Sequence, residues 1–389
     1  WSYDVSVWVL RLLNIAIVAP LTVLCWAAAR RFGLKPPLCI AASMVPLAVP
    51  GLTRVGATWN NDGILMLSTG ALTVVLAGVA RGDRRKRTAV WAGLWLAVAL
   101  WSKAFALLLP LMIISAYLIG ANAGRVRDGV RPWLRRLPWG PAIIALAIGS
   151  GAGLGFWVRN VVRYGAVEPN GWGTDPPRRE ALLLPKSFFT WFWYFFRTMI
   201  ARFWGGLGLF EPPTLSPWAV VPATAVIVVA AVAVLARRRQ PLGERCAPWM
   251  LVLPIAFAYL MTGERSYAQY RLYTRGIAVQ GRYLYLGVVG LAVVVMLGLG
   301  RLARGRERFV PIAVLASALL IQAAALVTIC TYYWVPRGHH LTPDRIGGAI
   351  AGIARWAPFP VAVTDTTFAA TALAVVVTAV VTTRTAVRR

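Results

Sequence analysis

Long apolar runs occupy most of this chain and limit what it can fold into. They lie at roughly 7–29, 37–53, 62–80, 88–102, 104–119, 139–158, 216–236, 247–262, 283–300, 310–333 and 360–382. Runs of this kind suit the roughly 30 Å hydrocarbon core of a bilayer, which admits only helices or closed barrels. The hydrophobic content of 59% and the mean hydropathy of +0.65 are typical of polytopic membrane proteins. We therefore expect a single all-α transmembrane domain over residues 1–389, with about eleven spans.

Basic residues cluster between these runs and predict the orientation of the chain. Lys and Arg concentrate in the cytoplasmic loops of membrane proteins. More than half of the 41 Lys and Arg residues lie in six segments, 30–35, 81–87, 125–136, 237–245, 301–308 and 382–389. We place all six in the cytoplasm, which puts the C-terminus inside and Trp1 outside. Because the chain starts with Trp1 rather than Met, we expect one more helix upstream and twelve or more spans in the full protein.

The net charge of +28 does not indicate a nucleic-acid partner, because basic loops are already required by membrane topology. We expect no nucleic-acid binding. The four cysteines lie in or beside apolar runs without paired spacing, so we expect buried thiols rather than a disulfide framework or a zinc site. They are Cys25, Cys39, Cys246 and Cys330.

Residues 88–119 are expected to form a hairpin, because basic segments flank them on both sides. The tip of this hairpin is Trp101-Ser102-Lys103. Arms of about fifteen residues reach roughly 22 Å at 1.5 Å per residue, which is shorter than the bilayer core. Lys103 should then lie below the outer surface, beside a cavity. An anionic partner is expected for it, because an unpaired lysine in lipid is costly.

Two longer segments, 166–215 and 334–358, are expected on the outer face. The first contains the aromatic stretch PKSFFTWFWYFFRTMIARFWGGLGLF, which we interpret as a helix lying in the outer interface, with a further crossing as the alternative. The second contains His339 and His340. Adjacent histidines without spaced partners form no strong metal site, so a solvated loop is the preferred interpretation.

More basic than acidic residues remain for the outer face, against the usual bias. Several lie at the ends of apolar runs, among them Arg159 and Arg163 in FWVRNVVRYG, and Arg275 and Arg282 in YRLYTRGIAVQGRYLYL. Snorkelling to lipid phosphates explains each one alone. Together with Lys103 they also form a candidate anion site.

The stretch NNDG places Asn60, Asn61 and Asp62 at the start of the run at 62–80. Two interpretations stay open. Asn or Asp before an apolar run can cap a helix by accepting hydrogen bonds from free backbone N–H groups. Alternatively, the two asparagines hold an outward-facing carboxylate that orients an acceptor or acts as a general base.

Five motifs occur together in an order that resembles a known superfamily. NNDG, GLWLAVALWSK, FWVRNVVRYG, RFWGGLGLF and VQGRYLYL, within roughly residues 8–300, are similar to segments of bacterial membrane proteins related to the GT-C glycosyltransferases. That superfamily includes protein O-mannosyltransferases and the lipid A aminoarabinose transferase. The resemblance implies a GT-C-type helix bundle, a sugar donor on polyprenyl phosphate or diphosphate, and inverting transfer on the extracytoplasmic face. It also implies an essential acid in the first outer loop, which would precede Trp1 unless Asp4 is its remnant.

The resemblance and the charge pattern together predict the partners and the site. The expected partners are a polyprenyl-linked sugar donor, membrane lipids and a cell-envelope glycan, lipid or protein acceptor at the bacterial plasma membrane. Some relatives use a divalent cation, but we assign no metal ligand. Cationic side chains suit a phosphate leaving group. The candidates are Asp62 as catalytic residue, Lys103, Arg159, Arg163, Arg275 and Arg282 for the donor phosphate, and Asn60, Asn61, Asn160, Gln280 and Tyr283 as supporting residues.

Two other functions stay open from the sequence. A transporter or flippase of lipid-linked saccharides would also need cationic residues and aromatic interfaces, although the chain has no self-similar halves. A non-catalytic membrane protein of envelope assembly is the second alternative.

Overall fold

The computed structural model describes residues 3–122, 138–169, 185–208, 212–235, 242–274, 279–336, 342–357 and 359–387. Within these ranges the fold is all-α, as predicted, and contains no β-strand. The helices are α1 (Tyr3–Val18), α2 (Leu21–Phe32), α3 (Pro36–Met44), η1 (Val45–Ala48), α4 (Pro50–Gly56), α5 (Asp62–Ala80), α6 (Lys86–Ser102), η2 (Ala104–Leu108), α7 (Leu109–Ala121), α9 (Trp139–Gly153), α10 (Gly155–Tyr164), α11 (Phe188–Gly205), α12 (Pro217–Leu235), α13 (Leu242–Leu251), α14 (Leu253–Tyr273), η4 (Gly281–Gly287), α15 (Val288–Leu302), η5 (Glu307–Phe309), α16 (Val310–Trp334), α17 (Pro343–Trp356) and α18 (Val361–Val387).

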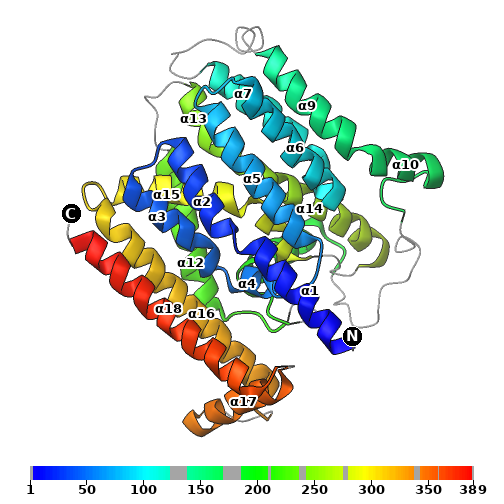
Figure 1. Ribbon diagram of the computed structural model, residues 1–389. Coiled ribbons are helices and arrows are strands. Elements are labelled where there is room, and N and C mark those ends of the chain that lie inside the picture. The colour runs from blue at the N-terminus through cyan, green and yellow to red at the C-terminus, as the bar shows by residue number, and fades with distance from the viewer. Residues whose placement is uncertain are drawn as a thin grey trace.

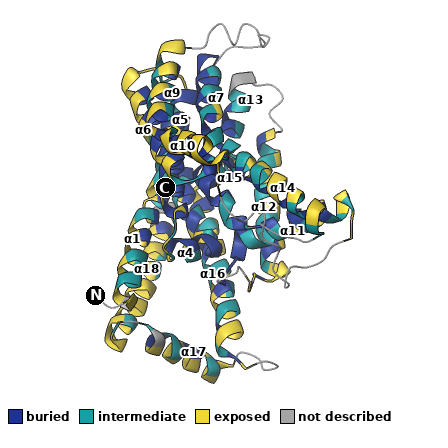
Figure 2. Ribbon diagram, turned by 90° about the vertical axis from the view of Figure 1, so that its right-hand side faces the viewer, coloured by how far each residue is buried: buried dark blue, intermediate teal, exposed yellow. Residues whose placement is uncertain are grey.

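Helix α5 lies at the centre of the bundle, where α1, α2, α6, α7 and α15 pack around it (Figure 1). The apolar part of α5 is 83% buried, whereas that of α18 is only 6% buried. Buried residues accordingly concentrate in the middle of the molecule, while α17 is largely exposed (Figure 2). The outer surface of α18 is apolar, as a lipid-facing helix requires. The four cysteines form no disulfide, and three of them are buried, namely Cys25, Cys39 and Cys330.

The chain is a polytopic helical membrane protein, although the exact number of spans stays a prediction. Each of the eleven apolar runs contains a helix. Seven helical segments in the described ranges are long and apolar enough to cross a membrane, or ten if each of three bent pairs counts as one span. The remaining run corresponds to α6, which has 17 residues.

Three of the predicted runs are bent at a break in the helix. The helix axis bends by 71° between η1 and α4, by 48° between α9 and α10, and by 52° between α13 and α14. Pro50 starts α4 and Pro254 lies in the first turn of α14. Proline has no backbone N–H to donate and clashes with the preceding turn, so helices restart at such positions. Hydropathy does not register these breaks, because the residues on both sides of each one are apolar.

Three of the six basic segments, 30–35, 81–87 and 301–308, lie at one end of the bundle, whereas residues 237–241, 388 and 389 lie outside the described residues. Lys35 forms an ion pair of 2.8 Å with Glu307. Arg84 donates a hydrogen bond of 3.4 Å to the carbonyl oxygen of Ala121, at the end of α7. Arg301 donates one of 2.7 Å to the carbonyl oxygen of Ala233 near the end of α12. Helix α18 runs antiparallel to α16, back toward the same end (Figure 1). The segment 125–136 lies outside the described residues.

Helices α6 and α7 form the predicted hairpin. The contact between Arg84 and Ala121 joins the start of one arm to the end of the other. Lys103 is the only residue between α6 and η2, and its backbone is extended there, with φ −167° and ψ 151°. At the base of the hairpin Asp83 binds Arg85 and Thr88, and its hydrogen bond with Arg85 lowers the pKa of the carboxyl to about 2. The arms are slightly longer than predicted, and Ala104–Ala121 is itself a candidate span.

Helices α6 and α9 pack closely because glycines line the contact. A Cβ atom at Gly149 would overlap the side chain of Leu96, and one at Gly153 would lie 2.7 Å from Leu100 Cβ. A Cβ atom at Gly93 would lie 2.8 Å from the carbonyl oxygen of Ala145. Small residues allow such close backbone approach between membrane helices. This contact holds the hairpin against α9 and α10.

The aromatic stretch forms α11, which is not among the candidate spans. One face of α11 is buried, and there the indole N–H of Trp191 donates to Ser266 Oγ of α14 at 3.2 Å. The opposite face exposes Phe189 and Trp193. Two such faces suit a helix at a membrane interface, and the placement of 166–215 on the outer side stays a prediction.

We expect Gly149→Leu to destabilise the bundle, because the new side chain would enter the space held by Leu96. Overpacking of this kind typically costs about 1–3 kcal/mol. Gly151→Leu is the matched control, because a Cβ atom there meets nothing within 4 Å. Thermal unfolding of both variants in detergent measures the difference. Equal thermal midpoints would contradict the packing described here.

Candidate functional site

Asp62 is the first residue of α5 and is buried, with 6% of its side chain exposed. Helix α5 ends beside the basic segment 81–87, so its 19 residues place Asp62 about 27 Å away from that segment along the helix axis. The N-cap residue of α5 is Asn61, and its side chain makes no capping hydrogen bond. Asn60 Oδ1 accepts a hydrogen bond of 2.9 Å from the backbone N–H of Asp62. The carboxylate of Asp62 is thereby left for other partners.

Lys103 is the partner of Asp62. Its Nζ atom lies 2.6 Å from Asp62 Oδ1, which confirms the expected anionic partner for a lysine below the surface. Arg282 approaches from η4, with its Nε atom 3.5 Å from Asp62 Oδ2. Both carboxylate oxygens therefore face a cation. The three side chains come from residues far apart in the sequence and carry one net positive charge.

Aromatic rings surround the lysine. Its Nζ atom lies 4.4 Å from the ring centroid of Tyr283 and 5.7 Å from that of Phe105. The guanidinium of Arg282 lies 5.6 Å from the same Tyr283 ring. Such cation–π contacts stabilise a cation that is partly removed from water. The sequence predicted Tyr283 as a supporting residue, whereas Phe105 was missed because an aromatic residue in an apolar run carries no signal of its own.

The loop before α5 is held by side-chain amides. Asn61 Nδ2 donates a hydrogen bond of 3.0 Å to the carbonyl oxygen of Ser102, which links NNDG directly to the tip of the hairpin. Asn60 Nδ2 donates to the carbonyl oxygens of Val55 and Thr58 at 3.2 and 2.9 Å. Asn60 and Asn61 thus support Asp62 and Lys103 through the backbone.

The segment that carries Arg282 is fixed against the end of α11. A Cβ atom at Gly281 would overlap the backbone of Phe203, so only glycine fits there. Tyr285 Oη donates a hydrogen bond of 2.7 Å to the carbonyl oxygen of Phe203, and Arg202 donates to the carbonyl oxygen of Val279. The motifs RFWGGLGLF and VQGRYLYL therefore meet in space, and their contact sets the position of Arg282.

Other predicted residues do not join this cluster. Arg159 and Arg163 are exposed on α10, and none of their described contacts reaches Asp62 or Lys103. Asn160 is buried but donates to the carbonyl oxygen of Val167. Gln280 lies two residues before Arg282 in the sequence. Its buried Oε1 atom has no hydrogen-bond donor among the described residues. Arg275, His339 and His340 lie outside the described residues.

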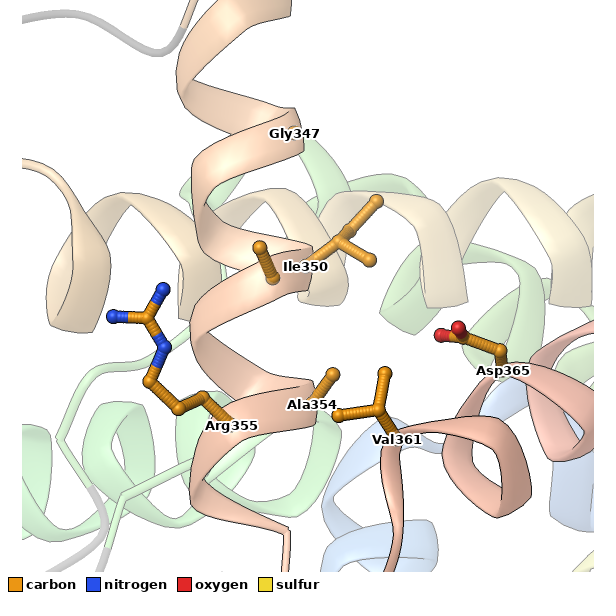
Figure 3. A pocket seen from close by; sticks show the side chains of 7 residues that line it. Gly347, Ile350, Ala354, Arg355, Val361 and Asp365 are labelled. Carbon is orange, nitrogen blue, oxygen red and sulfur yellow. The ribbon is translucent and has the colours of Figure 1, made fainter.

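The cluster is suited to binding an anion with two or more oxygen atoms. Lysine supplies a compact cation and arginine a planar donor that can bind phosphate oxygens. In the ranges listed above, no group of three or more His, Cys, Asp and Glu side chains could hold a metal ion. A separate cavity of about 420 Å³ lies between α17 and α18. Its lining is mostly apolar and includes Asp365 and Arg355, and the guanidinium of Arg355 points away from Asp365 (Figure 3).

We expect Asp62→Asn to lower stability by about 3–5 kcal/mol, because it removes the carboxylate that lies 2.6 Å from the Nζ atom of the largely buried Lys103. Lys103→Gln should lower stability by less, because Arg282 stays beside the carboxylate. The stability loss caused by Asp62→Asn should therefore be smaller in the Lys103→Gln background than in the wild type.

The matched control for this cycle is Glu307→Gln. Its partner Lys35 is 69% exposed, so removing that pair should change stability little, because water and salt screen an exposed ion pair. Thermal unfolding in detergent compares the four variants. Strictly additive losses for Asp62 and Lys103 would show that their ion pair contributes nothing to stability.

Comparison with known proteins finds one family model that matches part of the chain. Residues 3–152 match the model of the dolichyl-phosphate-mannose-protein mannosyltransferase family. This match includes Asp62 and Lys103 but not Arg282. No curated protein and no solved structure was found to match the chain. The match covers less than half of the chain, and it supports the resemblance to the GT-C-like superfamily of membrane glycosyltransferases that the order of the motifs predicted.

Proposed function

We propose that the protein transfers a sugar from a polyprenyl-phosphate-type lipid donor to an acceptor in the cell envelope. The observation that carries this proposal is the cluster of Asp62, Lys103 and Arg282, at the end of the bundle opposite the basic segments. A lipid-linked sugar brings one anionic group, the phosphate, to the membrane surface. A cluster with an excess of one positive charge complements that group.

In the proposed reaction the acceptor hydroxyl oxygen bonds to the anomeric carbon while the bond from that carbon to the phosphate oxygen breaks. Lys103 and Arg282 stabilise the negative charge that develops on the leaving phosphate. The phosphate competes with Asp62 for these cations, and its arrival leaves a carboxylate oxygen available. That oxygen orients the acceptor hydroxyl or accepts its proton.

The remaining candidates have outer roles in this proposal. Arg159 and Arg163 on α10, together with Arg275, make the approach to the site electropositive and attract the donor headgroup. Tyr283 supports Lys103 and Arg282 through its ring, and Asn160 and Gln280 stay supporting candidates outside the cluster. The prenyl chain lies along the apolar surface near the hairpin of α6 and α7, in contact with membrane lipids. The acceptor is a glycan, lipid or protein of the envelope.

The proposed location is a bacterial plasma membrane with the site on the extracytoplasmic face. The support is the positive-inside rule, because the basic segments 30–35, 81–87 and 301–308 gather at the opposite end of the bundle. The C-terminus is then cytoplasmic and α17 extracytoplasmic.

We expect Lys103→Ala and Arg282→Ala each to reduce sugar transfer by about 10²-fold or more, because each removes a cation that stabilises the leaving phosphate. Polyprenyl-phosphate mannose is a suitable donor probe, with purified full-length protein in lipid nanodiscs. Lys35→Ala is the matched control, because this lysine also forms an ion pair but lies at the basic end of the bundle. It should retain wild-type turnover.

Normal turnover in both Lys103→Ala and Arg282→Ala would refute the phosphate assignment. Movement of the intact lipid-linked sugar between leaflets of a proteoliposome, without release of the lipid phosphate, would instead support a flippase. No transfer and no translocation with any lipid-linked sugar would favour a non-catalytic role.

The orientation is tested by single cysteines in a background free of native ones. A cysteine in place of Asp344 at the start of α17 should react with a membrane-impermeant reagent in intact cells, whereas one in place of Arg306 should react only after permeabilisation. Both positions are exposed, so burial does not explain a difference. The reverse pattern would invert the topology and place the site in the cytoplasm.

A further inference from the structure

Asn14 is a polar residue inside an apolar helix, and nothing above gives it a function. It lies in α1, within the candidate span Val5–Phe32, and its exposed fraction is 0%. Its Nδ2 group donates to the carbonyl oxygens of Val55, Gly56 and Thr58 at 3.1, 2.9 and 2.8 Å. These carbonyls belong to the end of α4 and the loop that leads to NNDG. A single amide thus gathers the backbone that precedes the site.

The other side of the same amide contacts the start of α5. A Cβ atom at Gly63 would overlap Asn14 Oδ1, so the helix approaches Asn14 as closely as glycine allows. Asn14 Oδ1 is buried without a hydrogen-bond donor among the described residues. A buried acceptor without a donor is destabilising. Packing stability alone therefore does not explain an asparagine at this position, whereas a requirement for its N–H groups does.

Asn14 and Asn60 share their acceptors. Both donate to the carbonyl oxygens of Val55 and Thr58. Asn60 also accepts the backbone N–H of Asp62 at 2.9 Å. A continuous set of hydrogen bonds therefore runs from Asn14 through the loop to Asp62, and the contact with Gly63 closes it from the other side.

We infer that Asn14 is a positioning residue that aims the Asp62 carboxylate at Lys103 and Arg282. Its effect on the ion pair follows from geometry alone, and its kinetic effect rests on the proposed function. Without the amide, the carbonyls of residues 55, 56 and 58 lose a shared donor and the loop relaxes. Asp62 then shifts relative to Lys103, and the cations are no longer held where a donor phosphate binds.

The ion pair can be measured without any assumption about the reaction. The chain has four lysines, Lys35, Lys86, Lys103 and Lys186, so acylation of each amine can be followed by mass spectrometry. Asp62→Asn removes the carboxylate that pairs with Lys103. Its labelling rate is the reference for Lys103 without this ion pair. Asn14→Leu, which keeps the same branching of heavy atoms but has no donors, should raise the labelling of Lys103 toward that rate. In the double variant no further rise is expected.

Asn122→Leu is the matched control. Asn122 is also buried, and its amide donates to the carbonyl oxygen of Leu118 at the other end of the bundle. This variant should leave Lys103 labelling unchanged. Lys35, at the basic end, serves as an internal reference in every sample.

A kinetic measurement tests the same residue through the proposed reaction. With polyprenyl-phosphate mannose as the donor probe, Asn14→Leu should raise the donor KM or lower kcat by about fivefold or more, and this effect should nearly vanish in the Asp62→Asn background. Wild-type labelling of Lys103 in folded Asn14→Leu protein would overturn the inference. Increased labelling in Asn14→Leu, together with a wild-type protein that transfers no sugar, would uphold the positioning and refute the proposed function.

Two milder variants keep the test decisive if Asn14→Leu does not fold. Asn14→Ser keeps one donor and should give intermediate labelling of Lys103. Gly63→Ala leaves the amide in place but introduces the Cβ atom that Asn14 Oδ1 excludes, so it should also raise labelling. Wild-type labelling in both folded variants would contradict a positioning role for Asn14.

Discussion

A carboxylate and an ammonium group 2.6 Å apart inside an apolar bundle determine most of the local structure described here. Neither charge is tolerated alone at this depth, because moving an ion out of water costs far more than a single contact returns. Lys103 therefore requires Asp62, and the tip of the α6–α7 hairpin must meet the start of α5. Arg282, which lies in η4, reaches the same carboxylate. Three segments that are distant in sequence are held together by one electrostatic requirement.

The positions of these segments are precise because backbone contacts, rather than long side chains, hold them. Gly281 meets the backbone of Phe203, and Gly93 meets the carbonyl oxygen of Ala145 across the α6–α9 contact. Glycine at these places lets helices approach until their main chains touch, which leaves little freedom to shift. The amides of Asn60 and Asn61 add hydrogen bonds to carbonyl groups in the loop and at the hairpin tip. A charged cluster on such a frame does not need to reorganise before it binds an anion.

Hydropathy and basic-residue placement were enough to predict the helices, the hairpin and an anionic partner for Lys103. They did not predict the breaks before α4, α10 and α14, because the residues on both sides of each break are equally apolar. They also did not separate Arg282, which reaches Asp62, from Arg159, which stays exposed on α10. That difference depends on how η4 packs against α11. Asn14 was missed because a single polar residue in an apolar run gives no indication of which backbone it binds.

The charge balance of the cluster has a further source in the fold. Asp62 occupies the first turn of α5, where backbone N–H groups without helical partners add partial positive charge. One carboxylate thus faces a lysine, an arginine and the positive end of a helix. Asp62 is the only anion of the cluster, and its direct contact with Lys103 stabilises the folded protein before any ligand binds. Together Asp62, Lys103 and Arg282 still carry one net positive charge, which is the charge that the donor phosphate would meet in the proposed reaction.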